Sequence, residues 1–374
     1  MPGPNPAERL VALAADHADK AEADRRPTPE VVHAVREAGF ARHFVPARWG
    51  GTQGTFRWFL DTTAEVAAAD PSAAWVASIA ASLGRMAGFL PEAGQRAVWA
   101  GNPDALVVGA LLPGGEATAV AGGWLLSGRW AFVSGIDHAD HALLCVPVPV
   151  DGDRREVRFL LVPRSAYEIE RTWFTVGMRG TGSDTLVLAE PVFVPNGHSF
   201  ARETLLAGRP EASDAHCHRV PLKSVSGLSF AAPALGALDG ALTAWTASQA
   251  ARRAARAGGL GMSGETTATE ELALARAAGE TDAARLLLTR AATGADEGRP
   301  DAAATARAQR DHALAVDLLV AAVDGLLRSS GTRAQHESEP LQRYWRDVHA
   351  AAGHAVLRWE PAARAYAALR LESP

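Results

Sequence analysis

RWAFVSGIDHADHALL, residues 129–144, joins two apolar runs through a short polar break. The aromatic and β-branched residues from Trp130 to Val133 are typical of a strand, which is expected to end at Ser134 and Gly135. Two acids and two histidines follow within this stretch, before a second apolar run begins at Ala142. The pattern predicts two strands around a polar break. That break could be a metal site, an acid–base site or a loop beside a cofactor.

Similar short apolar runs, broken by Gly, Pro and Asp, extend over about residues 104–200 and predict an all-β region. Residues 5–100 have helical character, and four long segments with helical periodicity follow from about residue 222. We therefore expect an α+β multidomain protein. Its predicted parts are an N-terminal helical domain (1–103), a middle β-barrel or sandwich domain (104–220) and a C-terminal four-helix bundle (221–374).

Local signals place some element ends. In TPEVVHAVREAGF, Thr28 is a predicted N-cap, Pro29 takes the first helical position, and Gly39 stands where a helix would end. In the β region, Gly122 and Gly123 predict a hairpin turn.

Composition narrows the classes of function. The chain has 374 residues, 48% hydrophobic and 21% charged, with a net charge of −5 and no basic block, which disfavours a nucleic-acid surface. Two cysteines, Cys145 and Cys217, cannot form a framework of bridges and fit a reducing cytoplasm. We find no run of about 18 uncharged apolar residues and no secretion signal, so no membrane partner is expected.

Three motifs resemble ligand sites. Gly259-x-Gly261-x-x-Gly264 matches the dinucleotide fingerprint, but a helix precedes it, so we interpret it as a loop. His216-Cys217-His218 has no second pair of ligands elsewhere, and the polar residues of 137–141 would alternate between strand faces. We therefore predict no metal site.

Two further patterns leave alternatives open. The glycine-rich segment 178–183 would suit either a ligand-binding loop or a bulge with a turn. On a continuous last helix, Arg343, Asp347 and His354 would share one face, whereas His349 would point about 140° away from His354. His354 is then either an acid–base group tuned by a carboxylate or a core histidine of the bundle.

Taken together, three segments resemble the acyl-CoA dehydrogenase superfamily. They are GGWLLSGRWAFVSGIDHAD (122–140), GMRGTGSDTLVLAEPVFVP (177–195) and LQRYWRDVHAAAGHA (341–355), in that order on a helix–sheet–helix plan. More narrowly, they are similar to its flavin-dependent monooxygenase branch, the oxygenase component of two-component aromatic hydroxylases. The resemblance covers nearly the whole chain.

This resemblance implies an enzyme that takes reduced FMN or FAD from a separate flavin reductase and uses O2 through a C4a-hydroperoxyflavin. It would hydroxylate an aromatic, phenolic or polyketide-like small molecule, as a homotetramer. The implied catalytic residues are His354, over the reactive face, and Ser134, at the N5 edge. The implied flavin-binding residues are Trp130, Phe132, Ser134, Gly135, Met178, Arg179, Gly180, Thr181, Gly182 and Ser183.

Trp75, Arg85 and His138 are candidates to line the substrate. Many relatives have a histidine in the second buried helix, where this chain has Leu83, Gly84 or Arg85. Three alternatives remain. The first is amine N-oxygenation in the same branch. The second is an acyl-CoA dehydrogenase, with Glu360 or Glu372 as the only late acids available as base. The third is a catalytically silent scaffold.

Overall fold

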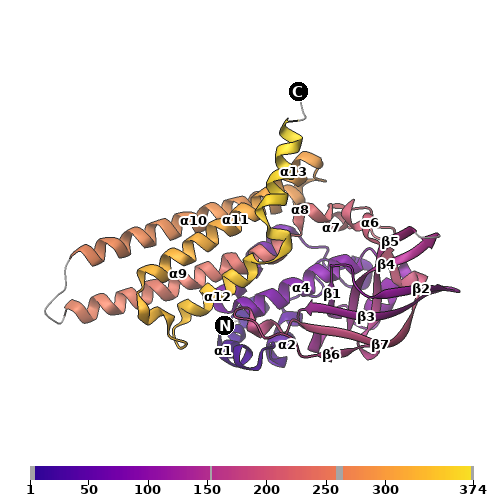
Figure 1. The fold of residues 1–374 in the computed structure, drawn as a ribbon, viewed down its shortest axis with the longest axis horizontal. Helices are drawn as coiled ribbons and strands as arrows, with labels where there is room; N and C mark the ends of the chain where they lie inside the picture. The colour runs from indigo at the N-terminus through magenta and orange to yellow at the C-terminus, as the bar shows by residue number, and fades with distance from the viewer. Residues whose placement is uncertain (1–4, 152–153, 258–263, 372–374) are drawn as a thin grey trace.

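A computed structural model describes residues 5–151, 154–257 and 264–371. Helices form the N-terminal part, two sheets follow, and long helices return at the end, as Figure 1 shows by its colour sequence. The first helices are α1 (Pro6–Asp24), α2 (Pro29–Glu37), α3 (Phe56–Ala69), α4 (Pro71–Ala87) and α5 (Glu92–Trp99). This order confirms the predicted fold class.

Side-chain caps fix two of these helix starts. The hydroxyl of Thr28 accepts the backbone N–H of Val31, with Pro29 in the first turn of α2, and Gly39 takes a φ of +83° just after α2 ends. These predictions are confirmed. At the start of α4, the carboxylate of Asp70 accepts two backbone N–H groups, which anchors the most deeply buried helix of the N-terminal part.

Two four-stranded sheets form the middle part, in the orders β1-β4-β5-β8 and β2-β3-β7-β6. Their strands are β1 (Val107–Ala110), β2 (Glu116–Val120), β3 (Gly123–Val133), β4 (His141–Asp151), β5 (Arg154–Pro163), β6 (Glu168–Glu170), β7 (Asp184–Pro195) and β8 (Ser199–Ala201). Strands β2 and β3 pair as a hairpin in which Val120 faces Gly123, as predicted. One apolar core contains residues from both sheets, such as Leu126 and Leu144.

The chain then becomes helical again. The later helices are α6 (Arg202–Leu206), α7 (His216–Arg219), α8 (Leu222–Val225), α9 (Leu228–Ala257), α10 (Gly264–Glu297), α11 (Ala302–Ser329), α12 (Pro340–Ala352) and α13 (Trp359–Leu371). Helices α9, α10 and α11 run side by side and extend away from the sheets, while α13 points away from the bundle (Figure 1). Residues 259–263 of the Gly259-x-Gly261-x-x-Gly264 motif lie outside the described residues.

One prediction about the last helix is wrong. A single helix was expected to carry Asp347 and His354 on one face, but α12 ends at Ala352, and His354 instead caps the short 3-10 turn η7 (Ala355–Leu357). Gly353 follows the helix end, and glycine is a weak helix former. The periodic spacing therefore did not place these two side chains on a common face.

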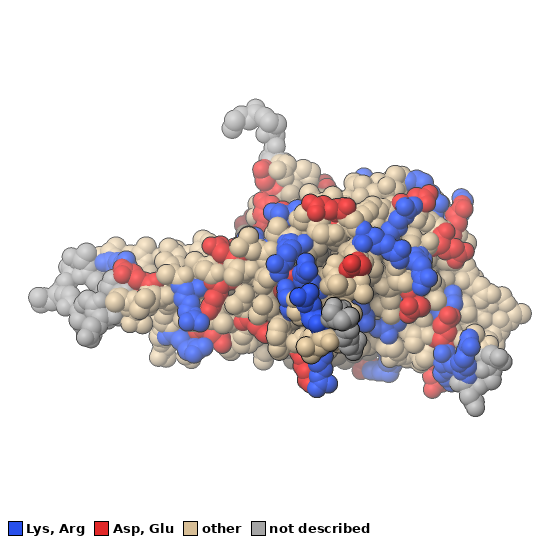
Figure 2. Space-filling view, turned by 90° about the horizontal axis from the view of Figure 1, so that it is seen from above, with Lys and Arg blue, Asp and Glu red and all other residues tan. Residues whose placement is uncertain are grey.

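The segment Leu222–Ala254 is long and apolar enough to span a membrane, and its most apolar 18-residue window has a mean hydropathy of 1.3. However, 83% of its most apolar window is buried inside the molecule. Its apolar residues pack against α3, α4 and α12, as expected for the central helix of a bundle. Positive and negative side chains both occur across the face shown in Figure 2.

Candidate functional site

The end of β3 meets the N-terminal helices through a chain of polar side chains. The indole N–H of Trp75, on α4, donates to the hydroxyl of Ser134 over 3.0 Å. The Ser134 hydroxyl lies 2.8 Å from that of Ser183, which lies 2.7 Å from that of Thr181. The Thr181 hydroxyl donates to the carbonyl of Met178 over 2.9 Å. The predicted strand end and the glycine-rich segment therefore form one connected site.

The directions of these hydrogen bonds follow from counting hydrogens, because each hydroxyl donates only one. Thr181 gives its hydrogen to the Met178 carbonyl, so Ser183 must donate to Thr181. Ser134 must then donate to Ser183. The Ser134 oxygen already accepts from Trp75 and keeps a second lone pair, which can accept a hydrogen bond from a ligand.

His354 joins this site from the other side. Its ring stacks on Phe230 of α9, with ring centroids 3.5 Å apart, and meets Trp75 edge-on at 6.2 Å. Burial lowers the pKa of His354 to about 4, so the ring is neutral at physiological pH. His349 instead pairs with Asp324 of α11 over 3.0 Å. The structure brings His354, and not His349, against Trp75.

The backbone of His354 and its neighbours also fixes the tautomer. The N–H of Val356 donates to Nδ1 of His354 over 3.3 Å, so Nδ1 acts as an acceptor. In a neutral imidazole the other nitrogen then carries the hydrogen. Nε2–H is therefore available as a hydrogen-bond donor.

The two aromatic residues predicted on β3 have different positions. Trp130 is buried between the sheets, and its indole N–H donates to the Cys145 carbonyl. It presents no exposed ring face at the site, so the structure does not support its predicted place beside the flavin. Phe132 is 68% exposed and contacts Trp173 edge-on at 6.1 Å.

The backbone around Phe132 is unusual. The β3–β7 register shifts between Trp130 and Val133, and Phe132 takes a φ of +64°, which a bulky residue rarely adopts. Met178 also has a positive φ, of +51°. Such conformations cluster at ligand sites because they aim side chains and peptide groups in directions that regular strands do not allow.

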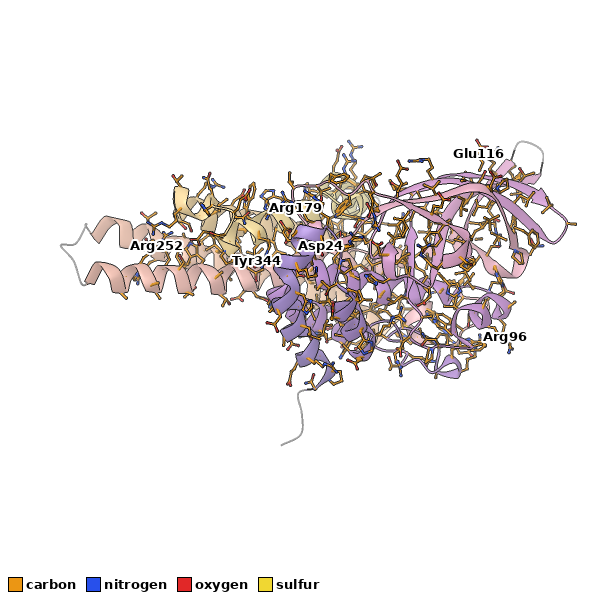
Figure 3. The ribbon with its side chains drawn as sticks, turned by 90° about the horizontal axis from the view of Figure 1, so that it is seen from below. Asp24, Arg96, Glu116, Arg179, Arg252 and Tyr344 are labelled. Atoms are coloured by element: carbon orange, nitrogen blue, oxygen red, sulfur yellow. The ribbon has the colours of Figure 1, made fainter. Side chains whose placement is uncertain are left out.

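The segment 178–183 is held in place from three sides. The backbone N–H of Gly135 donates to the Thr181 carbonyl over 2.9 Å. Arg179 pairs with Glu22 of α1, at the junction of helices seen in Figure 3. A Cβ on Gly180 would lie 3.0 Å from the Ser72 side chain. Arg179 and Gly180 therefore face the N-terminal helices, and Gly182, at a φ of +56°, precedes Ser183 at the turn's end.

The acids and histidines after Gly135 brace the β region. Asp137 pairs with Arg171, and Asp140 pairs with Arg36 of α2. The His138 ring meets the Pro27 carbonyl at 3.1 Å. Within residues 5–151, 154–257 and 264–371, no three His, Cys, Asp or Glu side chains gather in an arrangement that could hold a metal ion.

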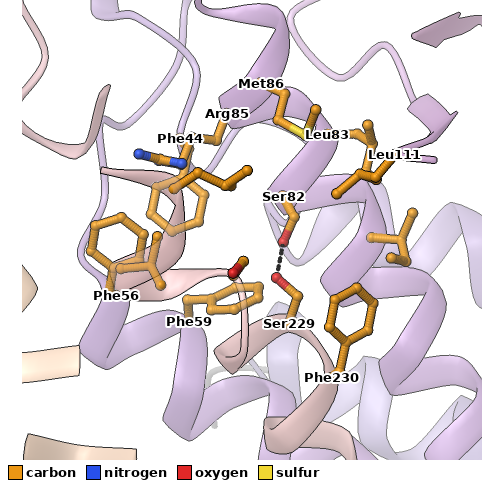
Figure 4. A pocket seen from close by; sticks show the side chains of 14 residues that line it. Phe44, Phe56, Phe59, Ser82, Leu83, Arg85, Met86, Leu111, Ser229 and Phe230 are labelled. Atoms are coloured by element: carbon orange, nitrogen blue, oxygen red, sulfur yellow. Dashed lines mark hydrogen bonds between the residues drawn. The ribbon is translucent and has the colours of Figure 1, made fainter. Parts of the chain in front are cut away.

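A narrow apolar cavity of about 40 Å³ is lined by Phe230, whose ring also stacks on His354. Its wall is mostly aromatic and aliphatic, and the hydroxyls of Ser82 and Ser229 meet across it at 2.7 Å (Figure 4). The lining residues are Phe44, Phe56, Phe59, Ile79, Ser82, Leu83, Arg85, Met86, Leu111, Leu222, Val225, Ser226, Ser229 and Phe230. Arg85 lines this cavity, and its contact with a substrate stays a prediction. Ser229 and Phe230 were not among the predicted residues, because the sequence of α9 is that of an ordinary core helix.

Comparison with known proteins now decides the family. Residues 228–359 match the model for the acyl-CoA dehydrogenase C-terminal domain. The oxygenase subunit HsaA of a flavin-dependent monooxygenase from Mycobacterium tuberculosis is 33% identical, over 93% of this chain and 90% of the relative. The chain belongs to this family of flavin-dependent monooxygenases. The predicted family and enzyme class are confirmed.

Other relatives agree with this assignment. The oxygenase component of an FADH2-dependent resorcinol hydroxylase from Rhizobium is 34% identical, over 96% of this monooxygenase and 94% of the relative. The crystal structure of 3-HSA hydroxylase from Rhodococcus matches with a TM-score of 0.90 at 29% identity, over 99% and 96% of the two chains. XiaF from Streptomyces, solved with FADH2 and glycerol, gives 0.88 at 27%, over 99% and 94%. The monooxygenase therefore uses reduced flavin and oxygen.

Among the residues that the structure describes, neither candidate base of a dehydrogenase lies at the site. Glu360 is exposed and pairs with Arg364 one helical turn away. Glu372 lies outside the described residues. In the monooxygenase, the group that meets Trp75 and Phe230 from the last helices is His354.

Proposed function

We propose that this monooxygenase binds reduced flavin against Phe132 and the end of β3, and hydroxylates an aromatic ring held in the cavity behind Phe230. The observation that carries the proposal is the continuous contact from Ser134 through Trp75 and Phe230 to His354. Phe230 lines the cavity and Ser134 stands at the strand end, so these contacts connect the two. A reaction at the flavin and a substrate in the cavity would therefore share them.

The residues beside the strand end suit a flat, partly apolar cofactor. Phe132, Phe174 and Val176 are 68%, 73% and 71% exposed, although residues of this kind are usually covered. Arg25 reaches across the same segment, with its guanidinium 5.5 Å from the Phe174 ring. When bound, reduced flavin supplies the electrons that activate oxygen. The chain's own residues provide the apolar cover and the hydrogen bonds.

Ser134 is arranged to accept rather than to donate. Its hydrogen is directed to Ser183, so its free lone pair suits an N–H group. Flavin carries a hydrogen at N5 only when it is reduced. The direction of the hydroxyl chain therefore supports selective binding of the reduced form and protection of that hydrogen from water.

His354 is arranged to donate. Its neutral ring presents Nε2–H, while Nδ1 is occupied by the Val356 N–H. A donor at this position can polarise a phenol oxygen or an oxygen that develops charge during transfer. Stacking on Phe230 holds the ring in one orientation.

The partners are part of the proposal. The names of the resorcinol and p-hydroxyphenylacetate relatives describe oxygenase components, which supports a separate reductase as the source of reduced flavin. Exposed Leu272 and Leu286 on α10 support assembly through the bundle, with a homotetramer as the expected state. Two buried free thiols, Cys145 and Cys217, support a reducing cytoplasm.

The test is anaerobic mixing of the protein with reduced FMN or FAD, followed by oxygenated buffer in a stopped-flow spectrometer. We expect flavin oxidation that is slower than that of free flavin, with a transient absorbance distinct from oxidised flavin, and faster decay when a phenolic substrate is present. Oxidation at the free-flavin rate with both flavins would overturn the proposal. Light scattering on the same sample measures the assembly.

A further inference from the structure

One end of the cavity contains a buried positive charge. Arg85, on α4, is only 3% exposed and lines the cavity at the end away from Phe230. In Figure 4 its guanidinium lies beside Phe44 and Phe56, with the Ser82–Ser229 pair between it and Phe230. The cavity therefore has a charged end and a reaction end.

The protein gives this charge only neutral partners. Nε donates to the Cys217 carbonyl over 2.7 Å, and Nη2 donates to the Val220 carbonyl. The guanidinium carbon also lies 5.5 Å from the Phe56 ring and 5.7 Å from the Phe89 ring. In the described part of the chain, Nη1 donates to no residue, and no carboxylate lies within 4.0 Å of Arg85.

A buried cation without a counter-ion is costly, because carbonyls and rings replace only part of its hydration. Burial lowers the pKa of Arg85 to about 10, so the side chain still carries its charge at neutral pH. Elsewhere, the buried acids Asp184 and Asp311 both have arginine partners. Arg85 is different in that its missing partner would have to come from the occupant of the cavity.

We infer that Arg85 binds an anionic oxygen of the aromatic substrate, a carboxylate or a phenolate, and so selects acidic aromatics. This rests on the proposed function. The rings of Phe44, Phe56 and Phe59 would flank the substrate ring. The Ser82 and Ser229 hydroxyls lie midway, and Nη1 is the free donor for the anion. Charge-assisted hydrogen bonds of this kind are about twice as strong as neutral ones.

The cavity must widen to admit a ring. Its volume is about 40 Å³, whereas a cavity of about 150 Å³ takes benzene. Met86 lines the cavity and allows it to widen, since a methionine side chain changes its conformation at little cost. Small probes are therefore the appropriate ones.

The test compares isosteric probes in the protein loaded with reduced flavin under anaerobic conditions. Calorimetric titration with benzoate and benzamide measures the preference for a carboxylate. Titration with 4-nitrophenol above and below its own pKa measures the preference for a phenolate. We expect at least one anion to bind about tenfold or more tighter than its neutral partner, as a charge-assisted bond implies. Tighter binding of benzoate than of benzamide identifies a carboxylate as the anionic group of the substrate. Tighter binding of nitrophenolate alone identifies a phenolate.

Substitution then assigns the preference to Arg85. Arg85→Gln should abolish this preference, and Arg85→Lys should keep most of it. Arg96→Gln is the matched control, because Arg96 is an exposed arginine of α5 that does not line the cavity. Should Arg85→Gln fail to fold, Ser82→Ala and the wild-type probe series still show whether the cavity prefers anionic probes.

Two results would overturn the inference. Equal affinity of the wild-type protein for both members of each probe pair is one. An anion preference that survives in Arg85→Gln is the other, and would leave Arg85 as a brace between α4 and the segment 217–220. If the wild-type protein oxidises reduced flavin as fast as free flavin does, the proposed function itself is wrong.

Discussion

The carboxylate of Asp347 on α12 accepts the backbone N–H of Met178 over 2.5 Å. This bond joins residues 169 positions apart and fixes the start of the turn that carries Thr181 and Ser183. The backbone of α12 also packs closely there, because a Cβ on Gly177 would come within 2.2 Å of the Arg346 carbonyl. Helix α12 therefore positions the hydroxyl chain without contacting the proposed ligands itself.

Asp347→Ala should weaken reduced-flavin binding as well as stability. The Met178 N–H would lose its partner in a buried place, which costs about 1–3 kcal/mol. Anaerobic titration with reduced flavin and urea unfolding measure the two effects. Asp324→Ala is the control, because Asp324 bonds Trp345 and His349 of α12 but not the turn. Equal loss of flavin affinity in both variants would contradict the positioning role.

The same carboxyl should give stability a pH dependence. Burial raises the pKa of Asp347 to about 7, well above its value in the unfolded chain. The native state then holds a proton that the unfolded state releases, so this group's contribution to the free energy of unfolding falls as pH rises from about 4 to 7. Burial also raises the pKa of Asp70 to about 6, with the same sign.

Buried histidines act in the opposite direction. Burial lowers the pKa of His43, His312 and His354 to about 4, so their contribution grows as pH rises from about 4 to 6.5. The prediction therefore concerns the difference in the free energy of unfolding between a variant and the wild-type protein. Relative to wild type, Asp347→Asn should gain stability as pH rises from 4 to 7, and a difference that stays flat would contradict it. Urea unfolding at several pH values measures this.

Ser134→Ala should uncouple oxygen use from product. The change removes the acceptor offered to the flavin and leaves the Trp75 N–H unpaired. We expect more hydrogen peroxide per oxygen consumed, with the fold retained. Peroxide assay and product chromatography give the ratio. Ser127→Ala is the control, because Ser127 lies on the same strand and is partly buried. An unchanged ratio of peroxide to oxygen in Ser134→Ala would show that Ser134 is not part of the site.

His354→Ala should lower the rate of hydroxylation by roughly 100-fold, the usual scale for loss of one proton-handling side chain. His354→Gln, which keeps an N–H donor, should retain more activity. Because the pKa of His354 is about 4, the wild-type rate should show no titration of this group between pH 5 and 8. Steady-state rates across that range provide the measurement. His349→Ala should have little effect, since His349 pairs with Asp324.

Two glycines provide a stability contrast. Gly177→Ala would push the turn off α12, because its Cβ would overlap the Arg346 carbonyl. We expect a loss of stability and of reduced-flavin binding. Gly279→Ala, on an exposed face of α10 with nothing within 4 Å, should gain roughly 1 kcal/mol from helix propensity. Thermal unfolding of both variants tests the pair, and a stable, flavin-binding Gly177→Ala protein would be the contrary result.

The sequence alone determined the order of the parts and several of their ends. Thr28, Pro29 and Gly39 act within one or two helical turns, and Gly122 acts within a hairpin, so neighbours along the chain were enough. The three family segments also pointed to flavin chemistry, through their resemblance to the acyl-CoA dehydrogenase superfamily. The hydroxyls of Ser134 and Ser183, both predicted beside the flavin, lie 2.8 Å apart.

The tertiary structure decided which side chains meet. His354 joins Phe230 only because α12 stops at Ala352, and no periodic pattern encodes that break. Trp130 and Phe132 look alike in the sequence, yet a bulge turns one into the sandwich core and the other outward. The charge on Arg85 is without a counter-ion only because α4 packs beneath the carbonyls of residues 217 and 220. Local propensity acts over a few residues, whereas these contacts depend on how distant elements pack.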